Sequence, residues 1–207
     1  MRLPTAPALP DELSLSEAVF VVVDVETTGM SPIDDRITEV AMMKVQDGRI
    51  VEEFSTLVNP LITIPHFITD LTGIDNLMVR DAPTAREIVP YVAEFLGGHV
   101  FTAHNAAFDW GFIREMARRE RDLELTNERL CTVRLTRRIL PALPSKSLGP
   151  VAEFLDILIP QRHRASGDAY ATAQILIRYL TYLQRKFAFQ TLGEVLRFQS
   201  AGPVSAL

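Results

Sequence analysis

The chain has 207 residues, of which 47% are hydrophobic and 23% are charged. This composition is typical of a globular domain, and no uninterrupted apolar run is long enough to cross a bilayer. The formal net charge is −5. Such a chain is unsuited to binding long nucleic acid through its overall field, because neutralising phosphates requires clustered lysine and arginine. An enzyme that grips only the end of a strand is not excluded.

The two ends of the chain and its single cysteine predict the domain organisation. The proline-rich start carries no apolar segment of the secretory type, so we expect a disordered leader over residues 1–16. One domain follows over residues 17–185, and residues 186–207 form a short tail that docks on the domain or on a partner. Cys131 excludes an intramolecular disulfide and favours a reducing, cytoplasmic location. We expect Cys131 to be a buried structural residue.

The first half of the chain predicts three strands. Residues 18–25 read AVFVVVDV, a short run rich in β-branched side chains, which favours a buried central strand over a helix. Residues 36–45 and 49–58 flank Asp47-Gly48, and an Asp-Gly pair between two such runs indicates a hairpin. The segment that follows is expected to be a loop, because Pro65 keeps it from turning helical early.

Helices alternate with one further strand in the second half. Residues 99–103 form a short apolar strand, and Asn105 is placed to cap the helix that follows. The predicted helices cover residues 84–96, 106–119, 133–140, 147–155 and 168–185. The order of strand, hairpin, then alternating helix and strand predicts an α/β domain built on a mixed sheet.

Asp24 and Glu26 are the first candidates for chemistry. Side chains two apart on a strand point to the same face, so the two carboxylates converge. Like charges with poor solvation are relieved by a raised pKa or by a cation, and a divalent ion with oxygen ligands fits. Taken alone, an Asp-x-Glu more often marks only the point where a strand exits into water.

Two further segments each place an acid near the start of a helix. In HNAAFD, Asp109 lies in the opening turns, where the helix dipole favours an anion. In HRASGDA, Asp168 starts a helix, Gly167 keeps the backbone pliable, and His163 lies in the preceding loop. Each segment also has a plain structural reading, since acids are common at helix starts and a histidine in a basic loop is usually just solvated.

Taken together, DVETTG, HNAAFD and HRASGDA resemble, in order and spacing, the three exonuclease motifs of the DnaQ-like DEDD superfamily. The subclass is the one with histidine in the third motif, which includes proofreading epsilon subunits of bacterial replicative polymerases. The resemblance spans residues 20–185, and the segments IPHFITDLTGI and LCTVRLTRRILP also look like this family. It implies a ribonuclease-H-like mixed five-stranded sheet flanked by helices.

The resemblance implies catalytic roles for five residues. Asp24, Glu26 and Asp168 would ligate one divalent ion, Mg²⁺ or Mn²⁺. Asp24 would bridge to a second ion, which Asp109 assists. His163 would take the proton from the attacking water, since an imidazole titrates near working pH. Two ions about 4 Å apart would activate that water, neutralise charge at phosphorus and help the 3′-oxygen to leave.

Contacts to the strand end are also implied by the family. The residues after the first motif would meet the 3′-terminal nucleotide, and those of the ITDLTGI loop would pack against its base or sugar. The candidates are Thr27, Thr28, Met30, Ile68, Leu71, Thr72 and Asn105. Turn formation, core packing and helix capping explain the same residues without a ligand.

Basic residues in the middle of the chain are candidates for contacts with the phosphate backbone beyond the cleaved end, although solvated helix faces explain most of them. They are Arg114, Arg118, Arg119, Arg134, Arg137, Arg138 and Lys146.

Three functions remain open on the sequence. The leading hypothesis is a DNA 3′→5′ exonuclease that acts on single-stranded or frayed ends and proofreads for a polymerase catalytic subunit. The second hypothesis is an exoribonuclease, which shares all three motifs. The amino-acid sequences of the motifs and of the ITDLTGI loop look closer to polymerase-associated enzymes. A non-catalytic module that binds a polymerase is the third, and the intact catalytic positions argue against it as the sole role. The tail is shorter than the polymerase-binding region expected of a full epsilon subunit.

Overall fold

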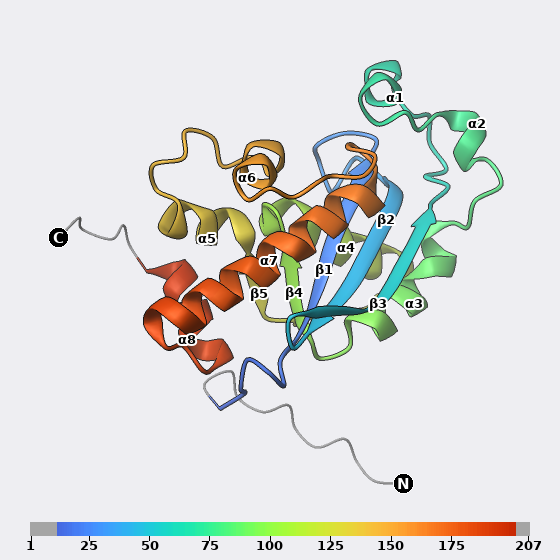
Figure 1. Cartoon of the computed structure of the whole chain (residues 1–207). Helices are drawn as coiled ribbons and strands as arrows, with labels where there is room; N and C mark the ends of the chain where they lie inside the picture. The colour runs from blue at the N-terminus through green and yellow to red at the C-terminus, as the bar shows by residue number, and fades with distance from the viewer. Residues whose placement is uncertain (1–11, 202–207) are drawn as a thin grey trace, which may run out of the picture.

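Five strands form one mixed sheet in the order β3-β2-β1-β4-β5 (Figure 1). The computed structural model describes residues 12–201. β1 pairs antiparallel with β2 and parallel with β4, and β5 runs parallel to β4. The predicted α/β domain on a mixed five-stranded sheet is confirmed. The strands are β1 Val19–Thr27, β2 Ile37–Gln46, β3 Arg49–Leu57, β4 Val100–Ala103 and β5 Arg129–Cys131.

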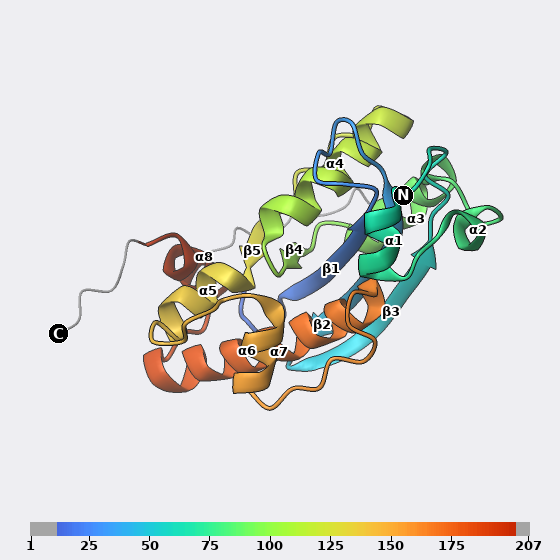
Figure 2. The same cartoon turned by 90° about the horizontal axis from the view of Figure 1, so that it is seen from above.

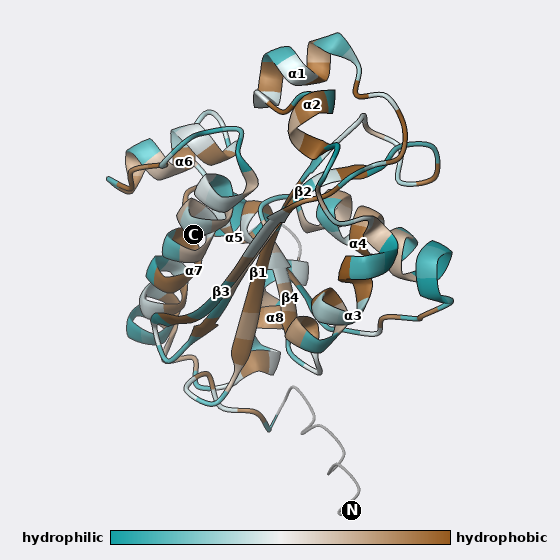
Figure 3. Ribbon diagram, turned by 90° about the vertical axis from the view of Figure 1, so that its right-hand side faces the viewer, coloured by the Kyte–Doolittle hydropathy of each residue, from teal (hydrophilic) through white to brown (hydrophobic). Residues whose placement is uncertain are grey.

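Helices cover both faces of this sheet (Figures 2 and 3). α7, together with α5 and α6, lies on one face, and α3 and α4 lie on the other. α1 and α2 lie beyond the ends of β2 and β3 (Figure 1). Among the helices of residues 12–201, none combines the length and the hydropathy that spanning a lipid bilayer requires. The helices are α1 His66–Thr72, α2 Asn76–Val79, α3 Ala85–Leu96, α4 Ala106–Arg121, α5 Thr132–Ile139, α6 Leu148–Phe154, α7 Ala165–Phe187 and α8 Leu192–Ser200.

The alternation of side chains along β1 explains why the sheet has a core on each side. Phe20 and Val22 belong to the cluster that includes the buried residues of α7. Val21 and Val23 belong to the cluster formed with α3 and α4. A strand that is apolar on both faces is buried on both faces, which is the position of a central strand. Residues of even number on β1 therefore face α7.

The predicted strands and helices are all present, with ends shifted by a few residues. At the hairpin turn, Asp47 and Gly48 have φ values of 46° and 71°, the left-handed conformations that an Asp-Gly turn supplies. The largest shift is in α7, which begins at Ala165 rather than at residue 168.

Four elements were not predicted, for different reasons. β5 has only three residues, too few for a periodic pattern. α1 and α2 lie where a loop was expected, and that expectation was wrong. Pro65 immediately precedes α1 with φ −62°, a conformation that suits a helix start rather than opposing it. α8 lies in the predicted tail.

Both predicted ends pack on the domain within the described residues. Ser14 bridges to Thr191, and the Leu15 N–H donates to the Gln190 carbonyl at 2.8 Å. Leu15 is buried in the core, so a disordered leader reaching residue 16 is wrong, because an apolar side chain there completes the packing against the end of the chain. Residues 1–11 lie outside the described part.

α8 closes the open edge of the sheet through Gln199. The Gln199 side-chain oxygen accepts from the Cys131 N–H at 2.9 Å, and its amide nitrogen donates to the Arg129 carbonyl at 2.7 Å. These two bonds stand in for the pairing that a sixth strand would give to β5. The predicted docking of the tail on the domain is therefore found. Cys131 is half-buried rather than buried, since it lies at this edge.

Replacing Gln199 by leucine tests this edge closure. Gln199→Leu keeps the volume but leaves a backbone donor and a backbone acceptor of β5 without their partner. We expect a loss of about 1–3 kcal/mol in the free energy of unfolding, measured by chemical denaturation. Ser200→Ala, an exposed change in the same turn, is the control and should cost far less. Equal stability of the two variants would contradict the role of Gln199.

Candidate active site

Three carboxylates from two elements meet at the end of β1. One oxygen from each of Asp24, Glu26 and Asp168 lies within 4.8 Å of the other two. Asp24 and Glu26 point to the face of β1 that α7 covers, because they follow Phe20 and Val22 in the alternation. Asp168 lies in the first turn of α7. The sequence motifs that are far apart along the chain thus form one acidic cluster.

A fourth carboxylate reaches β1 from the opposite layer. Asp109 lies in the first turn of α4 and is buried. Its Oδ1 accepts a hydrogen bond from the Val25 N–H at 3.2 Å. β4 pairs with β1 only as far as Val22, so the N–H of Val25 lies past the end of β4 and is open to a side chain. Asp109 is held against the same stretch of β1 that carries Asp24 and Glu26.

Burial raises the pKa of all four acids, and the charges of neighbouring carboxylates raise the pKa of Asp24 and Glu26 further. Burial is the larger cause for Asp24, followed by the charges of Asp109, Asp168 and Glu26, and its pKa lies well above the ordinary value. Burial and then the Asp168 charge raise the pKa of Glu26 to about 8. Burial raises the pKa of Asp109 to about 7 despite the hydrogen bond from Val25, and burial also raises the pKa of Asp168. The cluster needs protons or cations to be stable.

The donor set fits a divalent cation. Asp168 Oδ1 is buried and accepts no hydrogen bond from any residue in 12–201. Hard cations such as Mg²⁺ and Mn²⁺ prefer carboxylate oxygens, and a bound cation lowers the pKa of its ligands. An orphaned carboxylate oxygen between two further carboxylates has the chemistry of a ligand. The residues present therefore suit metal binding.

The loop before α7 is tied to the sheet by Glu39. Arg164 donates from Nε and Nη2 to the Glu39 carboxylate at 3.0 and 2.6 Å, and the Ala165 N–H donates to the same carboxylate at 2.8 Å. Glu39 is buried on β2, directly opposite Glu26 in the strand pairing. His163, half-buried with φ 62°, is the residue before Arg164. This bidentate pair fixes the backbone that carries His163.

The sequence interpretation of this loop missed that pair. The basic neighbours of His163 were considered only as a sign of a solvated loop, and no partner was predicted for Arg164. Glu39 was not singled out, although a glutamate inside the apolar run ITEVAMM is an available signal of a buried ion pair.

Gly167 is required by close packing rather than by a pliable backbone. A Cβ at this position would lie 1.6 Å from the Pro160 carbonyl oxygen and 2.8 Å from that of Gln161. The loop that leads to His163 therefore crosses the first turn of α7 at a distance that only glycine allows.

Gly167→Ala should displace the loop over residues 160–163. We expect loss of most activity with the fold retained, because His163 moves while the sheet does not. The readouts are nuclease turnover and the circular dichroism spectrum. Gly98→Ala is the control, since a Cβ there has open space around it, and it should keep normal turnover. A Gly167→Ala variant with normal turnover would contradict the packing argument.

The residues after β1 shape a turn and expose one methionine. Thr27 Oγ1 donates to the Gly29 carbonyl at 2.6 Å, and Thr28 Oγ1 donates to Asp35 at 3.1 Å. Both threonines are buried, whereas Met30 is 78% exposed. Turn formation accounts for the hydroxyls, and the Met30 side chain is free to meet a ligand.

The candidate residues of α1 also include both buried and exposed side chains. Ile68 packs in a small cluster with Ile64 and Ile74. The Thr72 hydroxyl donates to the Ile68 carbonyl at 2.9 Å. Leu71 is 55% exposed. The contacts of these side chains with a strand end remain predictions.

The second motif contributes a structural histidine and an uncapped helix. His104 Nε2 faces the Lys146 carbonyl at 2.9 Å and so carries the proton, which leaves Nδ1 to accept from the Thr132 hydroxyl at 2.9 Å. Burial lowers the pKa of His104 to about 4, so its ring is neutral.

The prediction that Asn105 caps α4 is wrong. Asn105 has a left-handed backbone at φ 76° and its side chain makes no capping bond.

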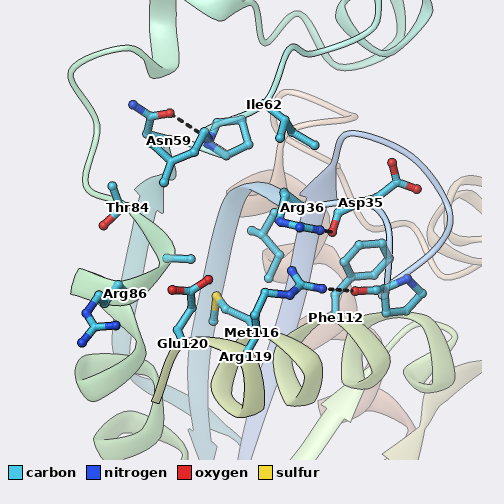
Figure 4. A pocket seen from close by; sticks show the side chains of 15 residues that line it. Asp35, Arg36, Asn59, Ile62, Thr84, Arg86, Phe112, Met116, Arg119 and Glu120 are labelled. Atoms are coloured by element: carbon cyan, nitrogen blue, oxygen red, sulfur yellow. Dashed lines mark hydrogen bonds between the residues drawn. The ribbon is translucent and has the colours of Figure 1, made fainter. Parts of the chain in front are cut away.

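A hollow of about 350 Å³ lies behind the turn, between α3 and α4 (Figure 4). Arg119 Nη2 donates to the carbonyls of Pro32 and Ile33 at 2.9 and 2.8 Å. Arg36 donates to the carbonyls of Asp34 and Asp35. Arg119 therefore holds the loop after β1 against α4, and Arg36 stabilises that loop from within.

Comparisons with known proteins agree with this geometry. The family model described as "Exonuclease", RNase T, matches residues 21–176. The chain is 45% identical over 179 residues to DNA polymerase III PolC-type of Caldanaerobacter subterraneus, covering 86% of this chain but only 13% of that protein. It is 37% identical over 174 residues to DNA polymerase III subunit epsilon of Aquifex aeolicus, covering 84% and 86%. Exonuclease X in complex with 5′-overhanging duplex DNA is 27% identical, with a TM-score of 0.70 and coverage of 87% and 99%.

The fold and the acidic cluster define a nuclease, a phosphodiester hydrolase with a ribonuclease-H-like sheet. The chain belongs to the RNase T/DnaQ-like exonuclease family, as the three motifs indicated, and is homologous to PolC exonuclease domains and epsilon subunits. This membership argues against a purely non-catalytic module.

The acidic cluster predicts how pH and metal act on stability. Glu26 has an ordinary pKa of 4.5 and a pKa of about 8 in the folded protein. Between these values the folded state holds a proton that the unfolded state has lost, so the free energy of unfolding of the metal-free protein falls as pH rises. Mg²⁺ or Mn²⁺ should therefore raise the melting temperature more at the upper end of this range than at the lower end.

Thermal denaturation with and without chelator measures both effects. Glu26→Gln should weaken the pH dependence and the gain from metal, because glutamine does not titrate. A metal-free protein that becomes more stable between pH 4.5 and 8 would contradict the cause given for the raised pKa.

Proposed function

We propose that the chain is a metal-dependent 3′→5′ exonuclease that removes nucleoside 5′-monophosphates from DNA 3′ ends. The observation that carries the proposal is the convergence of Asp24, Glu26 and Asp168 within 4.8 Å, with Asp109 on the same stretch of β1. Four acids whose pKa is raised by burial are suited to holding two divalent ions against a phosphate.

Each acid has a distinct place in this proposal. Asp24, Glu26 and Asp168 would hold one Mg²⁺ or Mn²⁺, and Asp24 and Asp109 would hold the second. The bound ions would supply Lewis-acid stabilisation of the phosphate and would lower the pKa of water. The hydrogen bond from the Val25 N–H keeps one oxygen of Asp109 engaged and fixes its orientation. Asp24 is the residue whose loss affects both ions.

His163 serves as the general base of the proposed reaction. It lies five residues before Asp168, in the loop that Glu39 ties to β2 through Arg164. In the proposed reaction its imidazole would accept the proton of the attacking water, the role that histidine most often takes in general acid–base catalysis. The bidentate ion pair limits the freedom of the loop and so keeps the imidazole near the nucleophile.

The strand end binds between the turn after β1 and α1 in this proposal. Exposed Met30 and Leu71 contact the terminal base. The pocket is completed by the backbone of Thr27 and Thr28 and by the side chains of Ile68, Thr72 and Asn105. Apolar contact with the base and backbone contact with the sugar suit an enzyme that reads the end of a strand rather than its sequence.

DNA is proposed as the substrate, with polymerase proofreading as the setting. The named relatives include a PolC-type polymerase and an epsilon subunit, and exonuclease X was solved with DNA. The chain spans 13% of the PolC-type protein, so the polymerase activity of that protein lies outside the region compared. A single-stranded or frayed 3′ end is the expected substrate form, and an exoribonuclease is the alternative.

End-labelled oligonucleotides test the proposal directly. Single-stranded DNA carrying a 5′ label should shorten stepwise in Mn²⁺ or Mg²⁺, with release of nucleoside 5′-monophosphates. Asp24→Ala, which removes the shared ligand, should abolish turnover. RNA of matched sequence and mismatched duplex DNA complete the panel. A large preference for RNA would mean that RNA, not DNA, is the substrate. If neither DNA nor RNA is cleaved, the proposed nuclease function is wrong.

His163→Ala separates proton transfer from metal binding. We expect turnover to fall by about 10²–10⁴-fold, the usual contribution of a general base. Titration of Mn²⁺, followed by calorimetry, should give unchanged metal affinity. Weaker metal binding in this variant would make His163 a ligand instead.

A further inference from the structure

A second pocket lies at the start of α4 and is lined by three arginines. It has a volume of about 460 Å³ and lies between the start of α4, β5, the start of α5 and α8. These elements lie together at one end of the sheet (Figures 1 and 2). Its lining includes Ala106 and Ala107 of α4, Arg134 and Arg137 of α5, and Arg129 of β5.

Four of the seven basic residues singled out from the sequence are engaged elsewhere, and one of these, Arg138, donates to the Ala201 carbonyl at 2.8 Å. Arg118 pairs with Glu115. Lys146 donates to the carbonyls of Pro141 and Leu143. Arg119, as described above, holds the loop after β1. These side chains have structural roles that account for their charge.

Arg134 and Arg137 are different. Both are exposed, and neither forms an ion pair or a side-chain hydrogen bond with a residue between 12 and 201. Arg129 is also exposed, and its guanidinium lies 5.6 Å from the Trp110 ring, which orients it without neutralising it. Glu128 is the single acid in the lining. In a chain of net charge −5, three such guanidinium groups around one hollow form a local positive site.

The backbone adds further donors to the same pocket. α4 and α5 both begin at it, and neither has a side-chain cap at its N-terminus. The first N–H groups of a helix have no partner within the helix, and the helix dipole favours an anion there. The pocket therefore combines guanidinium groups with helix N–H groups, the two kinds of donor that bind phosphate.

The pocket also lies close to the proposed cleavage site. Ala106 is one helical turn from Asp109 on α4, roughly 4.5 Å along the axis. This spacing is short enough for the next phosphates of a strand whose 3′ end lies at the acidic cluster to reach these arginines.

We propose that the Arg129, Arg134 and Arg137 pocket binds backbone phosphates of the nucleic-acid substrate beyond the scissile bond. This inference rests on the proposed nuclease function and names the part of the substrate that the pocket holds. The pocket sets affinity for long strands and contributes nothing to the chemistry at the strand end. Gln199 and Leu196 of α8 form one wall, so the end of the chain helps to build the site.

Two substrates of different length test the proposal. The long substrate is single-stranded DNA of about twelve nucleotides, within the range that one binding groove covers. The short one is the p-nitrophenyl ester of thymidine 5′-monophosphate, which has no further phosphate. Arg134→Ala/Arg137→Ala should raise KM for the long substrate about tenfold with little change in kcat, as expected for lost charge-assisted contacts. Its turnover of the short ester should match that of the unaltered protein.

Salt dependence and matched variants complete the test. Loss of two phosphate contacts should make the slope of log affinity against log salt shallower by about 1.4. Arg178→Ala/Arg185→Ala removes the same charge from exposed positions on α7 and should change neither quantity. Arg134→Lys/Arg137→Lys should retain most of the salt slope.

The outcomes separate the two proposals. An unaltered protein that cleaves neither substrate overturns the nuclease function. An unaltered protein that cleaves both, with an unchanged KM in Arg134→Ala/Arg137→Ala, overturns the phosphate pocket alone. An equal loss on the long and the short substrate also overturns it, because the arginines would then act at the reaction centre.

Discussion

The gathering of four carboxylates with little access to water is the constraint on which the rest of the structure depends. Burial raises the pKa of Asp24, Glu26, Asp109 and Asp168, and neighbouring carboxylates raise the pKa of Asp24 and Glu26 further. Such a cluster is stable only if protons or cations offset its charge. The surrounding elements are arranged so that the acids cannot move apart: two lie on a central strand, and one starts a helix on each face of the sheet. The free energy that holds these elements together comes from the two apolar cores on either side of β1.

The four carboxylates and His163, the proposed general base, are held in place by different kinds of structure. The acids stand on β1, α4 and α7, which are rigid because they are packed. His163 stands in a loop, and the loop is held by the ion pair of Arg164 with Glu39 and by the close crossing over Gly167. Glu39 lies opposite Glu26 in the strand pairing. Glu26 belongs to the acidic cluster, whereas Glu39 holds the loop that carries His163, the proposed general base.

Helix α8 contributes to the arginine pocket, and no sequence pattern predicted this contribution. α8 covers the edge of β5 through the Gln199 amide and forms a wall of the arginine pocket. An uncovered edge strand would expose backbone groups to other chains. The helix that covers the edge of the sheet therefore also lines the pocket for which phosphate binding is proposed.

The sequence by itself determined the class of fold and the candidate acids. AVFVVVDVE requires a buried strand with two carboxylates on one face, and the Asp-Gly turn requires the hairpin, because both follow from local periodicity. Only the tertiary structure decided which partners these residues have. The Glu39–Arg164 pair joins residues 125 positions apart, and the Gln199 closure joins α8 to β5, so neither leaves a periodic pattern. Helix α1 was missed because Pro65 permits either a loop or a helix start, and packing of Ile68 with Ile74 favours the helix. Local pattern determines elements, whereas long-range contacts between single side chains determine how the site is held.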